Sequence, residues 1–417
     1  RGLQPIAFDL YLFHSDMMKD CEGCKRKVCK ASCLLSVRRK FSLLYRQLVL
    51  ICNGSVILPC EPSFSNFGEV KEFCVGLLDP VSPHPWRAWF DENSRCPATW
   101  SVVHSLFLFR KVLPGGSREQ ALKDFKARIA RPSNPVSRKF LSFCKKEVKK
   151  IFPRGWDRGY SREVSSLSLP VTSYEDVDAP YGGCRVGGDP LVCQKALGLL
   201  PFSAPNTSEA AVVPDGGKWR IVTLNQSEVV ALAPLHRTMY NHLSLQDWLL
   251  RGDAKNSALR QFTNRKGELF VSGDYEAATD NIPLELYQLL LNLVQSTSTH
   301  VPASVWDEAL RQSRKDYIGV EGSVVEHNRG QLMGSFLSFP FLCLINYLCF
   351  KFSIPRSGVP VKINGDDIIF RATEDEFNTW IATVKDCGLV VSRGKTITDR
   401  QFFTINSCLF RGGRVGG

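Results

Sequence analysis

The stretch that decides the fold of this chain reads Ile363-Asn364-Gly365-Asp366-Asp367-Ile368. Apolar residues alternate on its incoming arm, Asn364-Gly365 is typical of a tight turn, and an apolar arm follows, so the pattern predicts a β-hairpin. Two adjacent carboxylates, Asp366 and Asp367, then lie at the hairpin tip and repel each other. A divalent cation would make that repulsion tolerable. Taken alone, such a turn also fits a solvated loop.

A second carboxylate follows a predicted strand upstream. Leu269–Gly273 is apolar and bounded like a buried strand, and Asp274 comes directly after it. If this strand neighbours the hairpin, the three carboxylates converge on one spot. They could then hold two Mg²⁺ (or Mn²⁺) ions roughly 3.5–4 Å apart, one activating an attacking hydroxyl and the other supporting a leaving pyrophosphate.

Basic residues upstream offer a place for phosphates. Residues 218–223 alternate like a strand after a Pro-Asp-Gly-Gly turn, and Lys218 and Arg220 share one face of it. That face suits a triphosphate, which Arg grips in bidentate fashion. An ordinary surface strand is the alternative for this pair.

Composition and charge favour a soluble nucleic-acid-binding protein. The 417 residues are 44% hydrophobic and 23% charged, ordinary globular values, and the net charge is +12. The excess is concentrated in two segments: residues 1–50 carry ten Lys/Arg against four acids, and 101–150 carry thirteen against three. Such segments suit a polyanion partner, nucleic acid above all, although a solvated basic helix face is the alternative. The first and last residues suggest a fragment of a longer product.

The fifteen cysteines are too scattered for a secreted disulfide framework. One cluster, at the basic N-terminus, has a spacing that could close a tetrahedral Zn²⁺ site, although free thiols on a basic helix fit it as well. Its members are Cys21, Cys24, Cys29 and Cys33.

Periodicity predicts an α+β fold with a central sheet. We expect two basic helices within 118–152 split at Pro132–Pro135, loops over 153–205, a helix over 234–250 and another beginning at Pro283. Thr373 and Glu376 predict a capping box for a helix closed by Gly388, followed by a strand at 389–391. The charge-free stretch 330–350 is interpreted as a buried loop and helix, so no integral membrane segment is expected.

At this point the chain resembles a family, the viral RNA-directed RNA polymerases, in the wording of ourmia-like (botourmiavirus) and narnavirus enzymes, which are related to levivirus replicases. The resemblance covers roughly residues 210–410, in the right order and spacing. Its carriers are Lys218-Trp219-Arg220 for motif F, Ser272 to Asn281 for motif A, Gly330 to Asn346 for motif B, Gly365-Asp366-Asp367 for motif C, and Ser392 to Thr396 with Phe403 to Ser407 for motifs D and E.

The resemblance implies a role for each matched residue. Asp274 and Asp366 would bind both metals, with Asp367 assisting. Asp280, separated from Asp274 by five residues, would accept a hydrogen bond from the ribose 2′-hydroxyl, which would favour ribonucleotides; it also fits an acid at a helix N-terminus.

The remaining roles concern the nucleotide and the leaving group. Asn346 would orient Asp280. Ser335 with Gly334 would form the flexible loop that lets the template–nucleotide pair move on, with a turn at the start of a helix as the alternative. Lys395 would protonate the departing pyrophosphate, with a plain surface lysine as the alternative.

The sequence thus predicts a right-hand polymerase with an antiparallel palm sheet flanked by helices. We expect a basic N-terminal region and fingers extension over 1–165, fingers over 166–260, a palm over 261–410 with a fingers insertion at about 296–329, and only the start of a truncated thumb at 411–417. It would copy an RNA template into nascent RNA from ribonucleoside triphosphates, replicating a positive-strand genome in the host cytoplasm.

Two other classes fit part of the pattern. A reverse transcriptase shares the metal logic of the palm, but Asp280 with Asn346, and Gly365 before the acidic pair, argue against it. A non-enzymatic basic RNA-binding protein with a decayed palm would bind RNA regardless of Asp366.

Overall fold

The structure is a computed structural model that describes residues 26–78, 84–110, 113, 117–167, 174, 190–215, 218–392 and 395–413, without the side chains of 26–33, 214, 215 and 218. The helices are α2 Arg26–Cys52, α3 Phe67–Gly76, α4 Pro85–Asn93, α5 Pro97–Phe109, α6 Arg118–Ala130, α7 Arg138–Ile151, α8 Tyr160–Ser165, α9 Pro190–Ala196, η3 Ser227–Leu232, α10 Ala233–Leu243, η4 Asn256–Leu259, η5 Thr279–Asn281, α11 Leu284–Gln295, α12 Ala303–Gln312, α13 Ser338–Ser353 and α14 Glu374–Asp386. The strands are β1 Thr207–Asp215, β2 Lys218–Leu224, β3 Leu269–Gly273, β4 Tyr317–Val320, β5 Ser323–Val325, β6 Val361–Asn364, β7 Asp367–Ala372, β8 Ile397–Asp399, β9 Phe402–Ile405 and β10 Cys408–Arg411.

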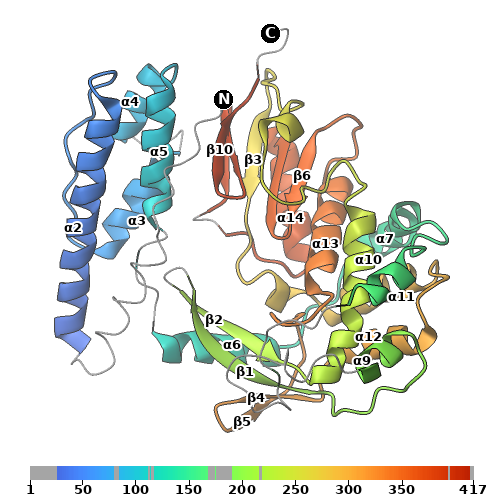
Figure 1. Ribbon diagram of the computed structural model, residues 1–417. Coiled ribbons are helices and arrows are strands. Elements are labelled where there is room, and N and C mark those ends of the chain that lie inside the picture. Colours follow the sequence, from blue (N-terminus) through green and yellow to red (C-terminus); the bar gives the residue numbers. More distant parts are fainter. Residues whose placement is uncertain are drawn as a thin grey trace.

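A four-stranded antiparallel sheet, in the order β6-β7-β3-β8, lies at the centre of the molecule (Figure 1). Its strands carry apolar side chains that are buried on both faces of the sheet, such as Phe270, Ile363 and Phe370. The β9–β10 hairpin lies beside it and is tied to β3 by the Thr404 amide, which donates to Ser272 Oγ over 2.8 Å. This sheet fixes where the ends of its strands, and the residues just beyond them, lie.

Helices α13 and α14 contact this sheet, and α7, α10 and α11 extend the same layer (Figure 1). They share one large apolar core with the sheet, in which α13 is buried along nearly its whole length. The charge-free stretch is therefore a loop followed by a buried helix, as predicted. Among the described residues, no helix has both the length and the apolar character that a membrane span requires.

A second four-stranded sheet, in the order β2-β1-β4-β5, lies at one end of the molecule, with α6 packed against it (Figure 1). Helix α6 buries Leu122, Phe125 and Ile129 at helical spacing against Ile318 and Val320 of the sheet. Both basic helices predicted between 118 and 152 exist, as α6 and α7, and they are separated at the predicted prolines.

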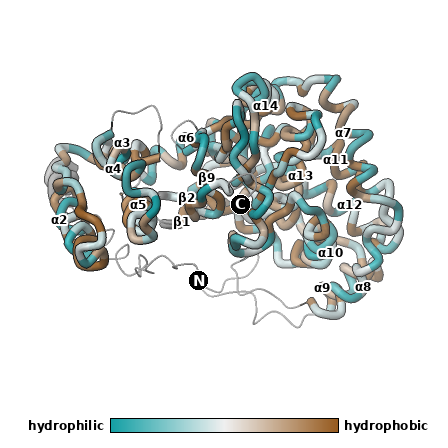
Figure 2. The backbone as a smooth tube through the Cα atoms, turned by 90° about the horizontal axis from the view of Figure 1, so that it is seen from above, coloured by the Kyte–Doolittle hydropathy of each residue, from teal (hydrophilic) through white to brown (hydrophobic). Residues whose placement is uncertain are grey.

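Helices α2 to α5 stand together at one side of the molecule in both views (Figures 1 and 2). Aromatic rings packed edge to face form their core, with Phe41 contacting Phe64, Phe73 and Phe109. Phe402 at the start of β9 joins this cluster, so the aromatic core continues from the helices into the hairpin.

Polar contacts also connect these helices to the strands. Arg87 of α4 donates to Asp399 over 2.9 Å, and His104 Nε2 of α5 lies 2.6 Å from the Ser407 carbonyl oxygen. The bundle is therefore attached to β8, the edge strand of the central sheet, and to the β9–β10 hairpin.

The α+β prediction is confirmed, and several local predictions were wrong. The two central residues of the β6–β7 turn are Gly365 and Asp366, one position later than predicted, because Asn364 pairs with Asp367. Gly365 adopts φ +65°, which tight hairpin turns require. Segment 153–205 contains the short helices α8 and α9, and α10 ends at Leu243, well before residue 250.

The end of the chain follows the prediction more closely. The capping box of α14 is present, with Thr373 and Glu376 each bonded to the other's backbone amide. The strand expected at 389–391 is reduced to one bridge, between Val391 and Tyr275.

Candidate active site

Strand register brings the predicted carboxylates to one end of the central sheet. Gly273 pairs with Ile368, so Asp274, the next residue, lies opposite the start of β7 at Asp367. Asp366 is in the turn directly before it. Asp274 and the pair Asp366-Asp367, which are far apart in sequence, thus lie on adjacent strand ends, as the sequence predicts.

Their electrostatics show a crowded negative site. Burial and the neighbouring Asp274 raise the pKa of Asp366, while Lys395 and Arg220 act in the opposite direction. Burial and the charges of Asp366 and Asp274 raise the pKa of Asp367 to about 7, although the Asn406 amide donates to its Oδ2 over 3.1 Å. A site that disfavours its own ionised carboxylates to this extent is suited to a cation.

Lys395 contacts Asp274 directly. Its Nζ lies 2.7 Å from Oδ1 and 3.0 Å from Oδ2. The register explains this: β8 runs antiparallel to β3, with Ile397 opposite Ser272, so Lys395 falls beside Asp274. Thr396 fixes the same backbone, since its Oγ1 accepts from the Asp274 amide at 3.2 Å.

The oxygen donors fit a hard divalent cation, because carboxylates are the ligands that Mg²⁺ and Mn²⁺ prefer. As the side chains stand, however, no three His, Cys, Asp or Glu groups of the described residues are gathered closely enough to hold a metal ion. Asp274 is ion-paired with Lys395, so a cation at Asp274 would compete with the Lys395 ammonium for the carboxylate oxygens.

Asn346 supports the turn that carries the acids. It is fully buried in α13; its Nδ2 donates to the Gly365 carbonyl over 3.1 Å, and its Oδ1 accepts from the Tyr275 hydroxyl over 2.7 Å. Asp280, in contrast, accepts from Arg128 Nη1 over 2.6 Å. Each residue thus has a partner of its own in the structure, and joint binding of a ribose by Asn346 and Asp280 stays a prediction.

The segment Gly330–Ser335 lies between the second sheet and η5. The Thr223 amide donates to the Met333 carbonyl over 2.7 Å, and the Gln331 amide donates to the Thr279 carbonyl over 2.7 Å. Gly334 adopts φ +126°, and a Cβ there would lie 2.1 Å from the Thr223 carbonyl oxygen. The close approach therefore requires glycine, and it places Ser335 beside the end of β2.

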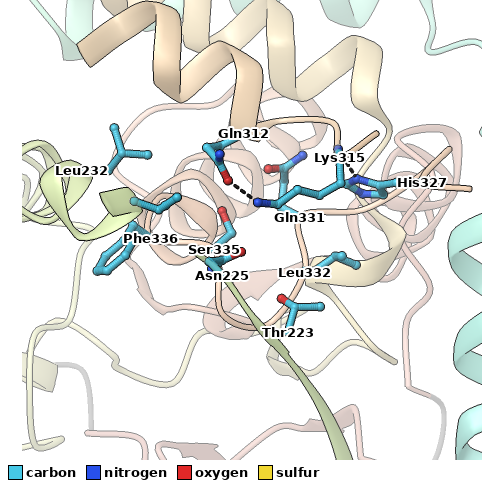
Figure 3. A pocket seen from close by; sticks show the side chains of 11 residues that line it. Thr223, Asn225, Leu232, Gln312, Lys315, His327, Gln331, Leu332, Ser335 and Phe336 are labelled. Carbon is cyan, nitrogen blue, oxygen red and sulfur yellow. Dashed lines mark hydrogen bonds between the residues drawn. The ribbon is translucent and has the colours of Figure 1, made fainter. Parts of the chain in front are cut away.

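Behind this segment is a small polar pocket, lined among others by Thr223, Gln331 and Ser335 (Figure 3). The buried Lys315 donates its backbone amide to His327 Nδ1 over 2.9 Å, and His327 Nε2 lies 3.0 Å from the Gly330 carbonyl oxygen. These contacts fix the position of Gly330, where the segment begins.

The strand that was predicted to hold phosphates is present as β2. Arg220 is exposed, and its charge reaches Asp366. Lys218 begins the strand, but its side chain lies outside the described residues, as do the side chains of Cys29 and Cys33. Cys21 and Cys24 are outside altogether, so the structure does not test the zinc site.

Two arginines near the site were missed by the sequence reasoning. Arg128 contacts Asp280, and Arg110, at the end of α5, lies close enough to Asp274 and Asp367 for their charges to raise its pKa. Burial nevertheless dominates and lowers the pKa of Arg110 to about 10. Both arginines come from the N-terminal helices, where no local pattern distinguishes them from other basic residues.

Comparisons with known proteins find a similar fold and a matching protein family. The fold is similar to that of a chain in a structure described as the segmented genome and RNA polymerase complex inside a dsRNA virus. The TM-score is 0.52 at 12% identity, covering 78% of this chain and 35% of that one.

The family of mitovirus RNA-dependent RNA polymerases matches residues 195–405, and the chain belongs to it. The RNA-dependent RNA polymerase of Ourmia melon virus (isolate Melon/Iran/VE9) is 25% identical, over 75% of this chain and 45% of its own.

Two further relatives are both 28% identical. They are the RNA-directed RNA polymerases of Cryphonectria parasitica mitovirus 1 (strain American chestnut tree/New Jersey/NB631), covering 49% of this chain and 25% of its own, and of Saccharomyces 23S RNA narnavirus, covering 47% and 23%. The chain spans less than half the length of each of these relatives. The predicted resemblance to ourmia-like and narnavirus polymerases is confirmed.

Proposed function

We propose that this chain carries the nucleotidyl-transfer centre of an RNA-directed RNA polymerase. One observation carries the proposal: three carboxylates from two adjacent strand ends, Asp274, Asp366 and Asp367, share a crowded negative site that is suited to a cation. The sheet β6-β7-β3-β8 would be the palm of a right-hand polymerase, and β1–β2 would belong to the fingers. RNA template, nascent RNA and ribonucleoside triphosphates would be its partners.

In the proposed reaction, the 3′-hydroxyl of the growing RNA gives up its proton to solvent, and its oxygen forms a bond to the α-phosphorus of an NTP. The bond from that phosphorus to the bridging oxygen breaks, and pyrophosphate leaves. Two Mg²⁺ or Mn²⁺ ions, when bound, supply charge for the attacking and leaving oxygens. Asp274 and Asp366 would hold them, with Asp367 assisting.

Arg220 and Lys218 would hold the triphosphate from β2, where the charge of Arg220 already reaches Asp366. Asp280 would accept the 2′-hydroxyl. Ser335, on the segment fixed between β2 and η5, would lie beside the nucleotide.

Lys395 would donate a proton to the leaving pyrophosphate. In the structure its ammonium neutralises Asp274. Exchange of this partner for a cation would free the Lys395 ammonium for the phosphates, so one lysine could serve both states.

The test is template-directed incorporation of labelled NTPs on a short primed RNA with Mg²⁺. Wild type should extend the primer, Asp366→Ala should not, and both should bind RNA alike. Asp307→Asn, at an exposed acid of α12, is the matched control and should extend normally.

Three results would contradict the proposal. RNA binding without synthesis by wild type would favour the decayed-palm alternative. Preferential use of dNTPs would favour a reverse transcriptase, and synthesis by Asp366→Ala would remove the proposed site.

A further inference from the structure

The ion pair between Arg128 and Asp280 joins an N-terminal helix to the proposed ribose contact. Arg128 Nη1 lies 2.6 Å from Asp280 Oδ2, and the side chains are only 29% and 15% exposed. The two residues are 152 positions apart in the chain. A charge-assisted contact this short restricts how the carboxylate can turn.

The surroundings make this geometry rigid. Helix α6 buries Ile129, the residue after Arg128, and the Ile129 carbonyl accepts from the Asn328 amide over 2.9 Å. The Gly330 amide donates to the Ile282 carbonyl over 2.9 Å, and a Cβ at Gly330 would lie 2.7 Å from the Asp280 carbonyl oxygen. Helix α6, segment 328–331 and η5 are thus held together around the pair.

The two oxygens of Asp280 are used unequally. Oδ2 accepts from Arg128, whereas Oδ1 accepts, among the residues that the structure describes, from Thr279 Oγ1 alone, over a long 3.5 Å. A carboxylate can accept several hydrogen bonds. Oδ1 therefore keeps the capacity to accept from a hydroxyl, and Arg128 holds the group from the other side.

We propose that Arg128 is a positioning residue for nucleotide selection, which holds Asp280 so that Oδ1 can accept the ribose 2′-hydroxyl of an incoming NTP. This inference rests on the proposed polymerase function. Arg128 acts through Asp280 and is not itself a ligand of the reacting atoms. Its charge also opposes the effect of burial, which raises the pKa of Asp280.

Single-nucleotide incorporation on primed RNA tests this, with kcat/KM measured for one NTP and for the matching dNTP. Arg128→Gln should lower the NTP/dNTP ratio by about tenfold, because the loss falls on the substrate that carries the hydroxyl. Arg128→Lys, which keeps the charge, should retain part of the ratio. Arg131→Gln removes a neighbouring exposed charge without touching Asp280 and should leave the ratio unchanged.

A double-variant cycle separates positioning from a merely structural role. In an Asp280→Asn background, Arg128→Gln should cause no further loss of discrimination. Additive losses in the double variant, or equal losses for NTP and dNTP in Arg128→Gln, would overturn the inference while the polymerase proposal stands. Failure of wild type to use either nucleotide would overturn both.

Discussion

Aspartates occur in two opposite settings in this molecule. One is the acidic end of the central sheet, and the other is the contact between helix α4 and strand β8. Asp399 is buried, but its carboxylate accepts from Arg87, from the Gln401 amide at 2.6 Å and from the Phe402 amide at 2.9 Å. Burial, together with the charge of Asp274, instead raises the pKa values of both Asp366 and Asp367, and the charge of Asp366 adds to the rise at Asp367.

The difference distinguishes carboxylates that stabilise the fold from carboxylates that serve to bind a ligand. A buried carboxylate whose hydrogen bonds are complete stabilises the fold, and removing it leaves a buried partner unpaired. A crowded carboxylate destabilises the unliganded protein and is retained for what it binds. Four substitutions test this contrast, from the largest expected effect to the smallest.

Asp366→Asn should abolish most synthesis while leaving the folded protein no less stable. We expect a loss on the order of 1,000-fold in kcat/KM, because a metal ligand is removed. The free energy of unfolding without metal should stay unchanged or rise by about 1 kcal/mol, since repulsion with Asp274 and Asp367 falls. Primer extension and urea unfolding measure the two. A large loss of stability would place Asp366 with the structural acids.

Arg87→Met should show the reverse pattern. It removes the charged partner of buried Asp399, and breaking such a pair costs about 3 to 5 kcal/mol. Synthesis per folded molecule should persist, because the contact lies at the bundle and not at the acidic end. The control is Arg95→Met on the loop after α4, which should change stability little. Loss of synthesis in folded Arg87→Met would show that the bundle is coupled to the site.

Short-range patterns explain what the sequence could predict. The β6–β7 hairpin and the capping box at Thr373 are encoded within a few residues, so both were predicted, the turn with a one-residue error. The convergence of Asp274 with Asp366 and Asp367 was predicted by taking the strand before Asp274 and the hairpin of the other two acids as neighbours. The contact of Lys395 with Asp274 needs the β3–β8 register, which no local signal provides.

Long-range contacts account for the rest. Arg110 and Arg128 reach the site from helices whose sequence shows only amphipathic packing. The N-terminal region gave no clear pattern because its aromatic core is formed between helices. The proposed domain bounds, the individual site roles and the compartment stay predictions.

His327 provides a third setting, in which a titratable side chain is buried and neutral. Burial, together with the charge of Lys315, lowers its pKa to about 4, although the Gly330 carbonyl opposes this. The unfolded chain binds a proton near pH 6.5 and the folded one only near pH 4, so this contribution to stability is present above pH 6.5 and is lost as pH falls. The loss should be on the order of 3 kcal/mol.

Urea unfolding of wild type and His327→Gln across pH 4 to 7 measures this pH-dependent loss of stability. The difference between the two should shrink as pH falls. Parallel curves would mean that His327 titrates alike in both states.

Thr373→Ala tests the opposite end of strand β7 from Asp367, where we expect the smallest effect. The Thr373 side chain caps α14 by accepting from the Glu376 amide, and losing an N-cap costs about 1 kcal/mol. Thr379→Ala, an exposed threonine on the same helix, is the control and should cost less than about 0.5 kcal/mol. Synthesis should not change in either variant, because the cap lies at the end of β7 away from the acidic site. Loss of synthesis in folded Thr373→Ala would mean that the two ends of β7 are not independent, and that the acidic end depends on how α14 is fixed as well as on its own register.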